Sequence, residues 1–223
     1  MTAQRLRIVG VMGSSTEPHT ELARPVGRII AQLGCHLLTG GGSGVMEEVC
    51  KAFCRTKPRK GLSIGILKGR LQIESTGERQ RFLLAPSPPN KWVELPVYTH
   101  LPLSGPRGRD ERSRNHINVI NPDVLVALPG QAGTYSEVTL RLDYGRRVIL
   151  FLGGHDIAGH PAAHFLSLAT ARGQVQIAGS PDELEALIRG SLIPGNDVLR
   201  KANRRIAHRP VTARNPSRGA IAR

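Results

Sequence analysis

Two kinds of hydrophobic pattern alternate along the chain, amphipathic stretches with helical spacing and short continuous apolar runs. In the clearest amphipathic stretch, residues 21–33, apolar side chains recur at helical intervals, and Gly34 follows as a stop signal. Further helices are predicted to begin near residues 45 and 135 and, after a Ser-Pro-Asp-Glu capping sequence, near residue 181. The short apolar runs predict strands at residues 5–12, 35–38, 62–67, 123–128, 148–152 and 175–177.

The order of these elements predicts the class of fold. Strands that alternate with helices are typical of a parallel sheet covered on both faces. We therefore expect an α/β fold, a Rossmann-like doubly wound parallel sheet in a single domain that occupies residues 1–194. Within this domain the Pro-rich residues 72–112 are predicted to form an excursion or lid, and residues 195–223 are predicted to form a basic C-terminal tail.

Composition narrows the environments in which such a domain would work. Hydrophobic residues make up 39% of the 223 positions, enough for a packed core. The longest apolar runs fall far short of the ~18 residues that a membrane span needs, and the first residues carry no signal-peptide pattern. Three cysteines do not indicate a disulfide framework. We expect a cytoplasmic protein with no membrane partner.

Charge points to anionic partners. The net charge is +14, and eight Lys or Arg residues without any acid lie after position 198. The eight aromatic residues, 4% of the chain, are too few for a protein that binds single strands by base stacking. Nucleic-acid binding is therefore expected only through the basic tail.

Three loops rich in Gly and Ser follow predicted strands: Gly13-Ser14-Ser15, residues 40–44 and residues 129–134. Because the carboxyl ends of parallel strands share one edge of the sheet, these loops should meet there. Glycine lets the backbone approach an anion closely, and the N–H groups of a following helix point at it. The spacing fits neither the dinucleotide-binding fingerprint nor the P-loop, and a tight strand-to-helix turn would explain the same glycines.

Two charged residues are candidates for chemistry beside these loops. Glu137 lies near the N-terminus of the helix that follows residues 129–134, where the helix dipole alone would also favour a carboxylate. Arg114 lies nine residues before Asp123, on a stretch that predicts a short helix leading into a strand, and a solvated arginine would be the simpler account. The pattern alone leaves both roles open.

In this order along the chain, the motifs resemble those of the LOG (LONELY GUY) superfamily. That group includes cytokinin-activating phosphoribohydrolases, proteins labelled lysine decarboxylase-like and the molybdenum cofactor carrier proteins. The resemblance covers residues 5–189 and rests on Gly13-Ser14-Ser15, Gly40-Gly41-Gly42-Ser43-Gly44-Val45-Met46, Arg114-Asn115 and residues 129–137. The pair Asn90 and Thr99 is closest in pattern to the carrier-type branch. Gln131 departs from the usual Pro-Gly-Gly, and Ser113-Arg114-Asn115 departs from a His-Glu-Arg-Lys type sequence.

The resemblance implies a nucleotide-binding protein that hydrolyses the N-glycosidic bond of nucleoside 5′-monophosphates to free base and ribose 5-phosphate. It implies catalytic roles for Arg114 and Glu137, because a carboxylate can stabilise the positive charge that develops on the ribose and a guanidinium can hold phosphate or sugar oxygens. It also implies a homodimer or higher homo-oligomer. The residues implied to bind the phosphate or nucleotide are Gly13, Ser14, Ser15, Gly41, Gly42, Ser43, Gly44, Met46, Asn115, Gly130, Gly133 and Thr134.

Two alternatives stay open beside this hydrolase. The same residues would serve a non-catalytic carrier or binder of a nucleotide-like or molybdopterin-type phosphate ligand, and a nucleic-acid-associated protein would use the basic tail. Neither the hydrolase nor the binder requires a further cofactor. No metal site is predicted, since Cys50 and Cys54 are best read as small core residues and His155, His160 and His164 show no clean ligand spacing.

Overall fold

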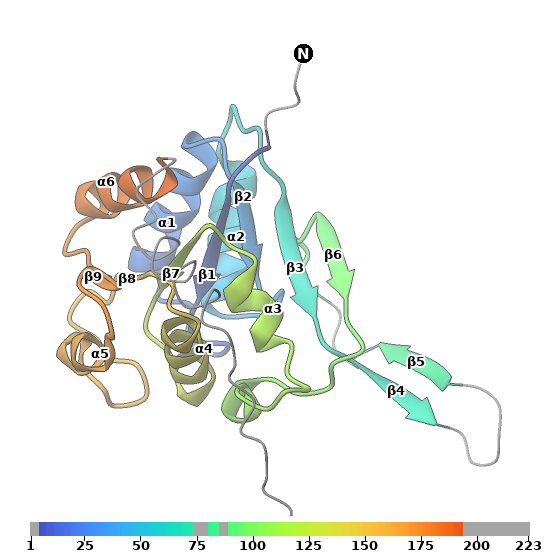
Figure 1. Ribbon diagram of the computed structural model, residues 1–223. Helices are drawn as coiled ribbons and strands as arrows, with labels where there is room; N and C mark the ends of the chain where they lie inside the picture. The colour runs from blue at the N-terminus through green and yellow to red at the C-terminus, as the bar shows by residue number, and fades with distance from the viewer. Residues whose placement is uncertain (1–4, 74–79, 85–88, 194–223) are drawn as a thin grey trace, which may run out of the picture.

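A parallel sheet forms the centre of the protein in the computed structural model, which describes residues 5–73, 80–84 and 89–193. Within these residues the sheet has seven strands in the order β6-β3-β2-β1-β7-β8-β9 (Figure 1), and each neighbouring pair is parallel. The predicted α/β fold is confirmed, and each of the six predicted strands is present. The strands are β1 (Ile8–Met12), β2 (His36–Thr39), β3 (Ser63–Leu67), β6 (Leu95–Tyr98), β7 (Val124–Ala127), β8 (Val148–Leu150) and β9 (Val175–Ile177).

Helices cover both faces of the sheet, as a doubly wound fold requires. One face carries α1 (Thr20–Gln32), α2 (Val45–Arg55) and α6 (Pro181–Leu192). The other face carries α3 (Asn115–Ile120), α4 (Ala132–Asp143) and α5 (Ala162–Leu168) (Figure 1). Helix α4 begins three residues before the predicted start near Tyr135, because the 129–134 loop already turns into helix at Ala132.

The hydrophobic core has two halves because side chains alternate along each strand. In β7, Val124 and Val126 pack with the α1, α2 and α6 side, whereas Leu125 and Ala127 pack with the α3, α4 and α5 side. Every residue of β7 is buried, as expected for a strand at the middle of a parallel sheet. The continuous apolar runs in the sequence therefore identified the central strands.

The Pro-rich stretch holds more regular structure than its composition suggests. Strand β6 belongs to the main sheet, where Pro96 is tolerated because β6 is an edge strand that pairs only with β3. Before it, β4 (Gly69–Ile73) and β5 (Gln80–Leu84) form an antiparallel hairpin that projects from the body (Figure 1). A 3₁₀ turn, η1 (Gly105–Arg107), follows β6. Part of the predicted lid lies outside the described residues. The predicted tail, residues 195–223, lies outside them entirely.

Among the helices in the described part of the chain, none is both long and apolar enough to cross a bilayer.

Candidate functional site

Hydrogen bonds hold the three Gly- and Ser-containing loops together at the carboxyl edge of the sheet. The amide of Ser14 donates to the carbonyl of Pro129 at 2.9 Å, and the amide of Val45 donates to the carbonyl of Ser14 at 2.9 Å. The Ser43 hydroxyl donates to the Ser15 carbonyl at 2.6 Å. The loop after β1 thus bridges the loops after β2 and β7, and the prediction that the three loops meet at one edge is confirmed.

Glycine is needed where these loops touch. Gly44 has a φ of +65°, and a β-carbon there would lie 2.5 Å from the Ser14 carbonyl oxygen. A β-carbon on Gly130 would lie 2.9 Å from the Ser14 amide nitrogen and 2.8 Å from the Thr134 β-carbon. Side chains at these two positions would therefore push the loops apart.

The serines and the threonine that were predicted to bind phosphate differ in their exposure to solvent. Ser15 and Ser43 are exposed at the surface of the junction. Ser14 and Thr134 are 4% and 3% exposed, and the Ser14 hydroxyl accepts from the amides of Thr16 and Glu17 within its own turn. Ser14 therefore shapes the loop, while Ser15 and Ser43 face solvent.

The remaining glycines and Met46 set the packing around this junction. A β-carbon would meet Val45 at Gly13, Leu67 at Gly41, Met46 at Gly42 and Gly105 at Gly133. Met46 itself is half-buried against Gly42. These positions keep the backbones of neighbouring segments close together.

Asn90 fixes the glycine loop after β2 from outside. Its amide donates to the Gly41 carbonyl at 2.8 Å, and its side-chain Nδ2 donates to the Gly42 carbonyl at 2.8 Å. Thr39 holds the same loop from within, because its Oγ1 accepts from the Gly41 amide at 3.1 Å. The sequence marked Asn90 only as a feature of the carrier-type branch, and its clamping role emerges from the structure.

Arg114 lies beneath the glycine loop rather than in solvent. It caps the start of α3, its Nη1 donates to the Ile66 carbonyl, and a β-carbon on Gly40 would lie 2.6 Å from that nitrogen. Its Nε is buried without a hydrogen-bond partner among the described residues. Burial lowers the pKa of the Arg114 guanidinium, and the carboxylate of Glu137 opposes this effect.

Glu137 is 9% exposed on the second turn of α4, and its Oε1 accepts from Asn118 Nδ2 at 3.0 Å. Burial raises the pKa of this carboxyl, while the Asn118 hydrogen bond and the Arg114 guanidinium act in the opposite direction. The opposite charges of the Glu137 carboxylate and the Arg114 guanidinium therefore stabilise each other.

Asn118 was not among the predicted residues, although a signal for it exists in the sequence. It lies four positions after Arg114 on a predicted helix, so both share one helix face. Asn118 is fully buried, and its Oδ1 has no partner among the described residues. An unpaired buried acceptor beside a carboxyl is unusual and marks the pair as a site for a further donor.

Asn115 is 1% exposed and faces the protein interior. Its Nδ2 donates to the Ser136 hydroxyl at 3.2 Å, and this contact joins α3 to α4. The structure thus places Asn115 behind the surface of the junction, where it links α3 to α4.

Backbone donors also converge on this edge. The first N–H groups of a helix have no acceptor within that helix, and both α2 and α4 begin at the loop junction. In α4 the Tyr135 amide donates to the Gln131 carbonyl, so the amides of residues 132–134 precede the first internal hydrogen bond. Two helix N-termini at one edge favour an anionic ligand.

Known proteins are similar to this chain in sequence and in structure. The model of the SLOG cluster4 family matches residues 6–185. An uncharacterized protein of Archaeoglobus fulgidus is 30% identical over 146 residues, which are 65% of this chain and 79% of that protein.

Two solved structures are similar over most of the chain. The molybdenum cofactor carrier protein of Chlamydomonas reinhardtii is 28% identical with a TM-score of 0.60, and the match covers 84% of this chain and 99% of that one. The molybdenum cofactor binding protein of the phototrophic bacterium Rippkaea orientalis is 30% identical with a TM-score of 0.61, and the match covers 86% of this chain and 100% of that one.

Proposed function

Because the chain belongs to the SLOG cluster4 family, we propose that it binds a small phosphate-bearing ligand, of the nucleotide or molybdopterin type, at the junction of its three loops. The sequence-based resemblance to the LOG superfamily and its molybdenum cofactor carrier branch is confirmed by the family match and the similar structures. A binding role is common to both branches of that superfamily.

The observation that carries this proposal is the close packing of glycine backbones at the junction. Gly44 and Gly130 both approach Ser14 so closely that any side chain would collide with it. The N-termini of α2 and α4 begin from the same loops. This packing holds the starts of α2 and α4 at one junction, and two positive helix ends are a favourable environment for a phosphate dianion.

Side chains around the junction would supply the remaining contacts. The exposed Ser15 hydroxyl can donate to a phosphate oxygen, whereas the Ser43 hydroxyl donates to the Ser15 carbonyl and holds the two loops together. Asn90 holds the glycine loop in place, while Arg114 contributes positive charge from below. Asn115, Met46 and Thr134 support the loops from the interior side in this proposal.

A second candidate function is hydrolysis of the N-glycosidic bond of a nucleoside 5′-monophosphate. It is favoured by two buried groups of opposite charge, Arg114 under Gly40 of the glycine loop and Glu137 against Asn118 of α3. In this reaction water adds at the ribose C1′, the bond from C1′ to the base nitrogen breaks, and the products are free base and ribose 5-phosphate. Glu137 would stabilise the developing ribosyl cation or orient the water, and Arg114 would hold the sugar phosphate.

One experiment tests both functions. Nucleoside monophosphates and a phosphorylated pterin are added to the purified chain, the melting temperature is recorded, and mass spectrometry measures released base. A ligand at 100 times its Kd adds about 2.7 kcal/mol, which corresponds to a rise of roughly 5–10 °C for a protein of this size. A binder gives this rise without released base, whereas a hydrolase also releases base.

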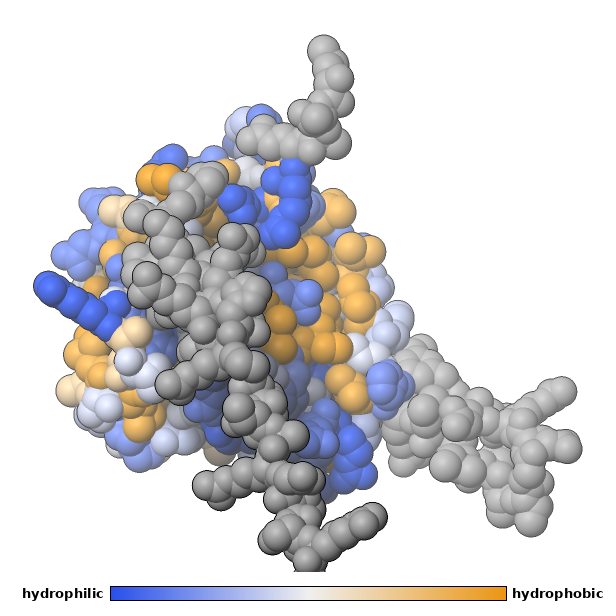
Figure 2. All heavy atoms as spheres, viewed as in Figure 1, coloured by the Kyte–Doolittle hydropathy of each residue, from blue (hydrophilic) through white to orange (hydrophobic). Residues whose placement is uncertain are grey.

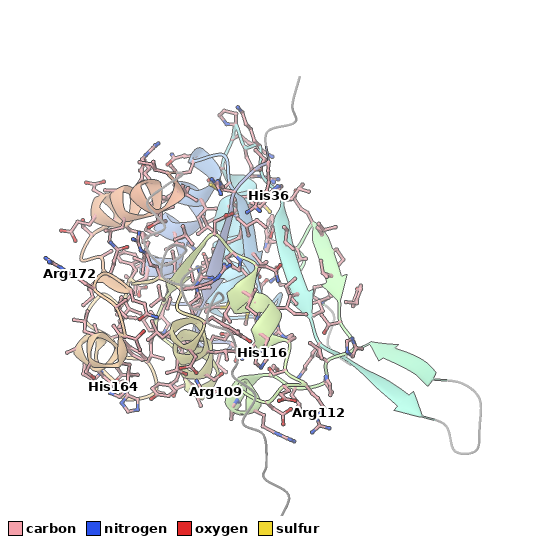
Figure 3. All side chains as sticks on the ribbon, viewed as in Figure 1. His36, Arg109, Arg112, His116, His164 and Arg172 are labelled. Carbon is pink, nitrogen blue, oxygen red and sulfur yellow. The ribbon has the colours of Figure 1, made fainter. Side chains whose placement is uncertain are left out.

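Variants separate the two outcomes. Glu137→Gln is expected to keep ligand binding in both cases and to abolish base release if the protein is a hydrolase. Arg114→Lys is expected to weaken binding about tenfold or more, because lysine cannot present the guanidinium fork. Arg172→Lys is the matched control, since Arg172 is exposed and points away from the body (Figure 3). The absence of a melting shift with every phosphorylated compound, together with no released base, would contradict the proposal.

A further inference from the structure

Two histidines and a glutamate come together on the same edge of the sheet, beside the loop junction but outside it. His19, Glu21 and His155 each offer one ligand atom, and these three atoms all lie within 4.8 Å of one another. His19 and Glu21 belong to the start of α1, whereas His155 follows β8. Only the tertiary structure brings these two segments together.

The loop that carries His155 is held in place from two sides. Gly153 and Gly154 have φ values of +56° and +86°, and they turn the chain immediately before His155. Gly153 packs against Leu22 of α1, because a β-carbon there would lie 2.8 Å from the leucine. On the other side, the Ala158 amide donates to the Gly130 carbonyl at 2.8 Å. The His155 backbone is therefore fixed relative to α1.

His19 has a backbone conformation that its role as a helix cap does not explain. It is the N-cap of α1 with φ 38° and ψ 56°, and its side chain makes no capping hydrogen bond. A left-handed conformation is unfavourable for a residue other than glycine, and Ser, Asp or Asn are the usual caps. Histidine at this position therefore has a cost and no local structural benefit.

We propose that His19, Glu21 and His155 bind a divalent transition-metal ion, for which zinc is the best match. Two imidazoles and one carboxylate form an established zinc ligand set that leaves a fourth position open to water or a ligand. With bonds of about 2.0–2.2 Å, tetrahedral ligand atoms lie roughly 3.3–3.5 Å apart. The three ligand atoms lie within 4.8 Å of one another, somewhat farther apart than this spacing. Because Glu21 and His155 are exposed and His19 is half-buried, small side-chain rotations can bring the atoms to the distance that a bound ion needs.

The rings themselves offer a competing account. His19 and His155 lie 5.0 Å apart between centroids with an edge-to-face angle of 67°. Such a pair also forms through aromatic packing alone. The Glu21→Gln variant separates the two accounts, because packing of the rings does not need a carboxylate, whereas metal binding gains from it.

The other histidine cluster of the loop edge is a suitable control. His160 and His164 stack at 4.1 Å, and the Tyr135 hydroxyl lies 3.2 Å from His164 Nε2. His164 lies in α5 and points outward (Figure 3). Among the described residues no acidic side chain forms a candidate metal cluster with these rings, so His164→Ala removes a half-buried imidazole without touching the proposed site.

The test is a titration of the full chain with Zn²⁺ by calorimetry and with Co²⁺ by visible absorption. We expect one site per chain, a Co²⁺ spectrum of low coordination number, and affinity that falls as the pH is lowered because imidazole binds metal only when neutral. His19→Asn and His155→Ala should each weaken Zn²⁺ binding at least tenfold, and Glu21→Gln should weaken it severalfold. His19→Asn keeps a residue that tolerates the left-handed backbone, so its folding is preserved.

Binding that survives His19→Asn and His155→Ala but disappears in His164→Ala would overturn the assignment. Failure of the wild-type chain to bind either ion at micromolar concentration would also overturn it and would leave ring packing as the explanation of the pair. The readout is metal binding by itself, so either result is independent of the proposed phosphate ligand.

Discussion

The spacing between the three loops is controlled at single residues. Gly44 and Gly130 press against Ser14, whose backbone groups bond to both neighbouring loops and whose hydroxyl holds its own turn. The sequence identified these glycines and serines because close backbone approach has a local signature. It did not identify which of the serines would be buried, since that depends on how the loops pack.

Gly44→Ala is expected to destabilise the protein by about 3 kcal/mol. Roughly 1–2 kcal/mol comes from the left-handed backbone, and the rest comes from the overlap of the new methyl group with the Ser14 carbonyl. Thermal or urea unfolding measures the effect. Gly173→Ala is the matched control, because Gly173 also has a positive φ of 74° but has no heavy atom within 4 Å of the added carbon. Equal losses in both variants would show that loop contact at Gly44 is unimportant.

Asp123 provides the pH dependence expected at this scale. Burial alone would raise the pKa of its carboxyl, but the hydrogen bond from the Ile8 amide at 2.9 Å and the guanidinium groups of Arg5 and Arg7 hold it below its usual value. A carboxyl whose pKa is lower in the folded state stabilises the protein fully at pH values above its unfolded-state pKa of about 3.9. This stabilisation is lost as the pH falls through the pKa of the folded state.

Asp123→Asn is therefore expected to lower the free energy of unfolding by about 1–2 kcal/mol at neutral pH. The ion pair contributes only a small part of this, because Arg5 is exposed to solvent. The free energies of unfolding of the two proteins, measured against pH, should move closer together as the pH falls below about 3.9 and through the lower pKa of the folded state. A difference that stays constant over this range would show that the carboxylate charge is not responsible.

At the scale of elements, the helix ends are where sequence and structure agree most closely. Ser180 caps α6, its Oγ accepts from the Glu183 amide at 3.2 Å, and Glu183 Oε2 accepts in turn from the Gly179 amide at 2.8 Å. The Ser180 bond is the one that the Ser-Pro-Asp-Glu sequence predicted, whereas the Glu183 carboxylate accepts from the amide one residue before the cap and not from that of Ser180 itself. A capping motif is local, so its residues suffice to specify it.

Ser180→Ala should lower the free energy of unfolding by about 1 kcal/mol, because the amide at the third helix position loses its acceptor. Ser180→Asp should recover most of this loss, since its carboxylate accepts the same bond and also interacts well with the helix dipole. Chemical denaturation measures both changes. If Ser180→Asp is as unstable as Ser180→Ala, the cap does not stabilise α6.

For the molecule as a whole, the notable surface lies at the β6 edge of the sheet. Figure 2 shows hydrophobic residues gathered over β3, β6 and α3. Leu62, Leu95, Val97 and Tyr98 are among the large apolar side chains exposed on this side. An apolar edge strand invites pairing with another chain, and this supports the homo-oligomer that the superfamily resemblance implies.

Leu95→Lys is expected to shift the protein toward a monomer, because an ammonium group would be buried in the proposed contact between copies. Light scattering after size-exclusion chromatography gives the mass. Ile177→Lys is the matched control, since Ile177 is 45% exposed, close to the 44% of Leu95, and lies on β9 at the opposite edge of the sheet. A wild-type monomer at micromolar concentration, or equal effects of the two substitutions, would exclude this surface as the interface.

Much of the fold follows from local pattern. The apolar runs marked the central strands, the amphipathic stretch marked α1, and the three small-residue loops followed strands, so their common edge could be inferred from parallel topology alone. Strand β6 was not predicted, because it contains a proline and its four residues are exposed, so it lacks the continuous apolar pattern of a buried strand. Its place beside β3 depends on a pairing that local sequence does not encode.

The sequence by itself determined which backbones are able to approach one another and where charge is available for an anion, because glycine content and helix starts are properties of short segments. Tertiary structure decided which distant side chains would become partners. It placed Asn118 against Glu137, Arg141 against the carbonyls around Val119 and Pro122, and His155 against His19. These contacts join segments whose separation is set by strand order, and strand order is fixed only when the whole sheet packs.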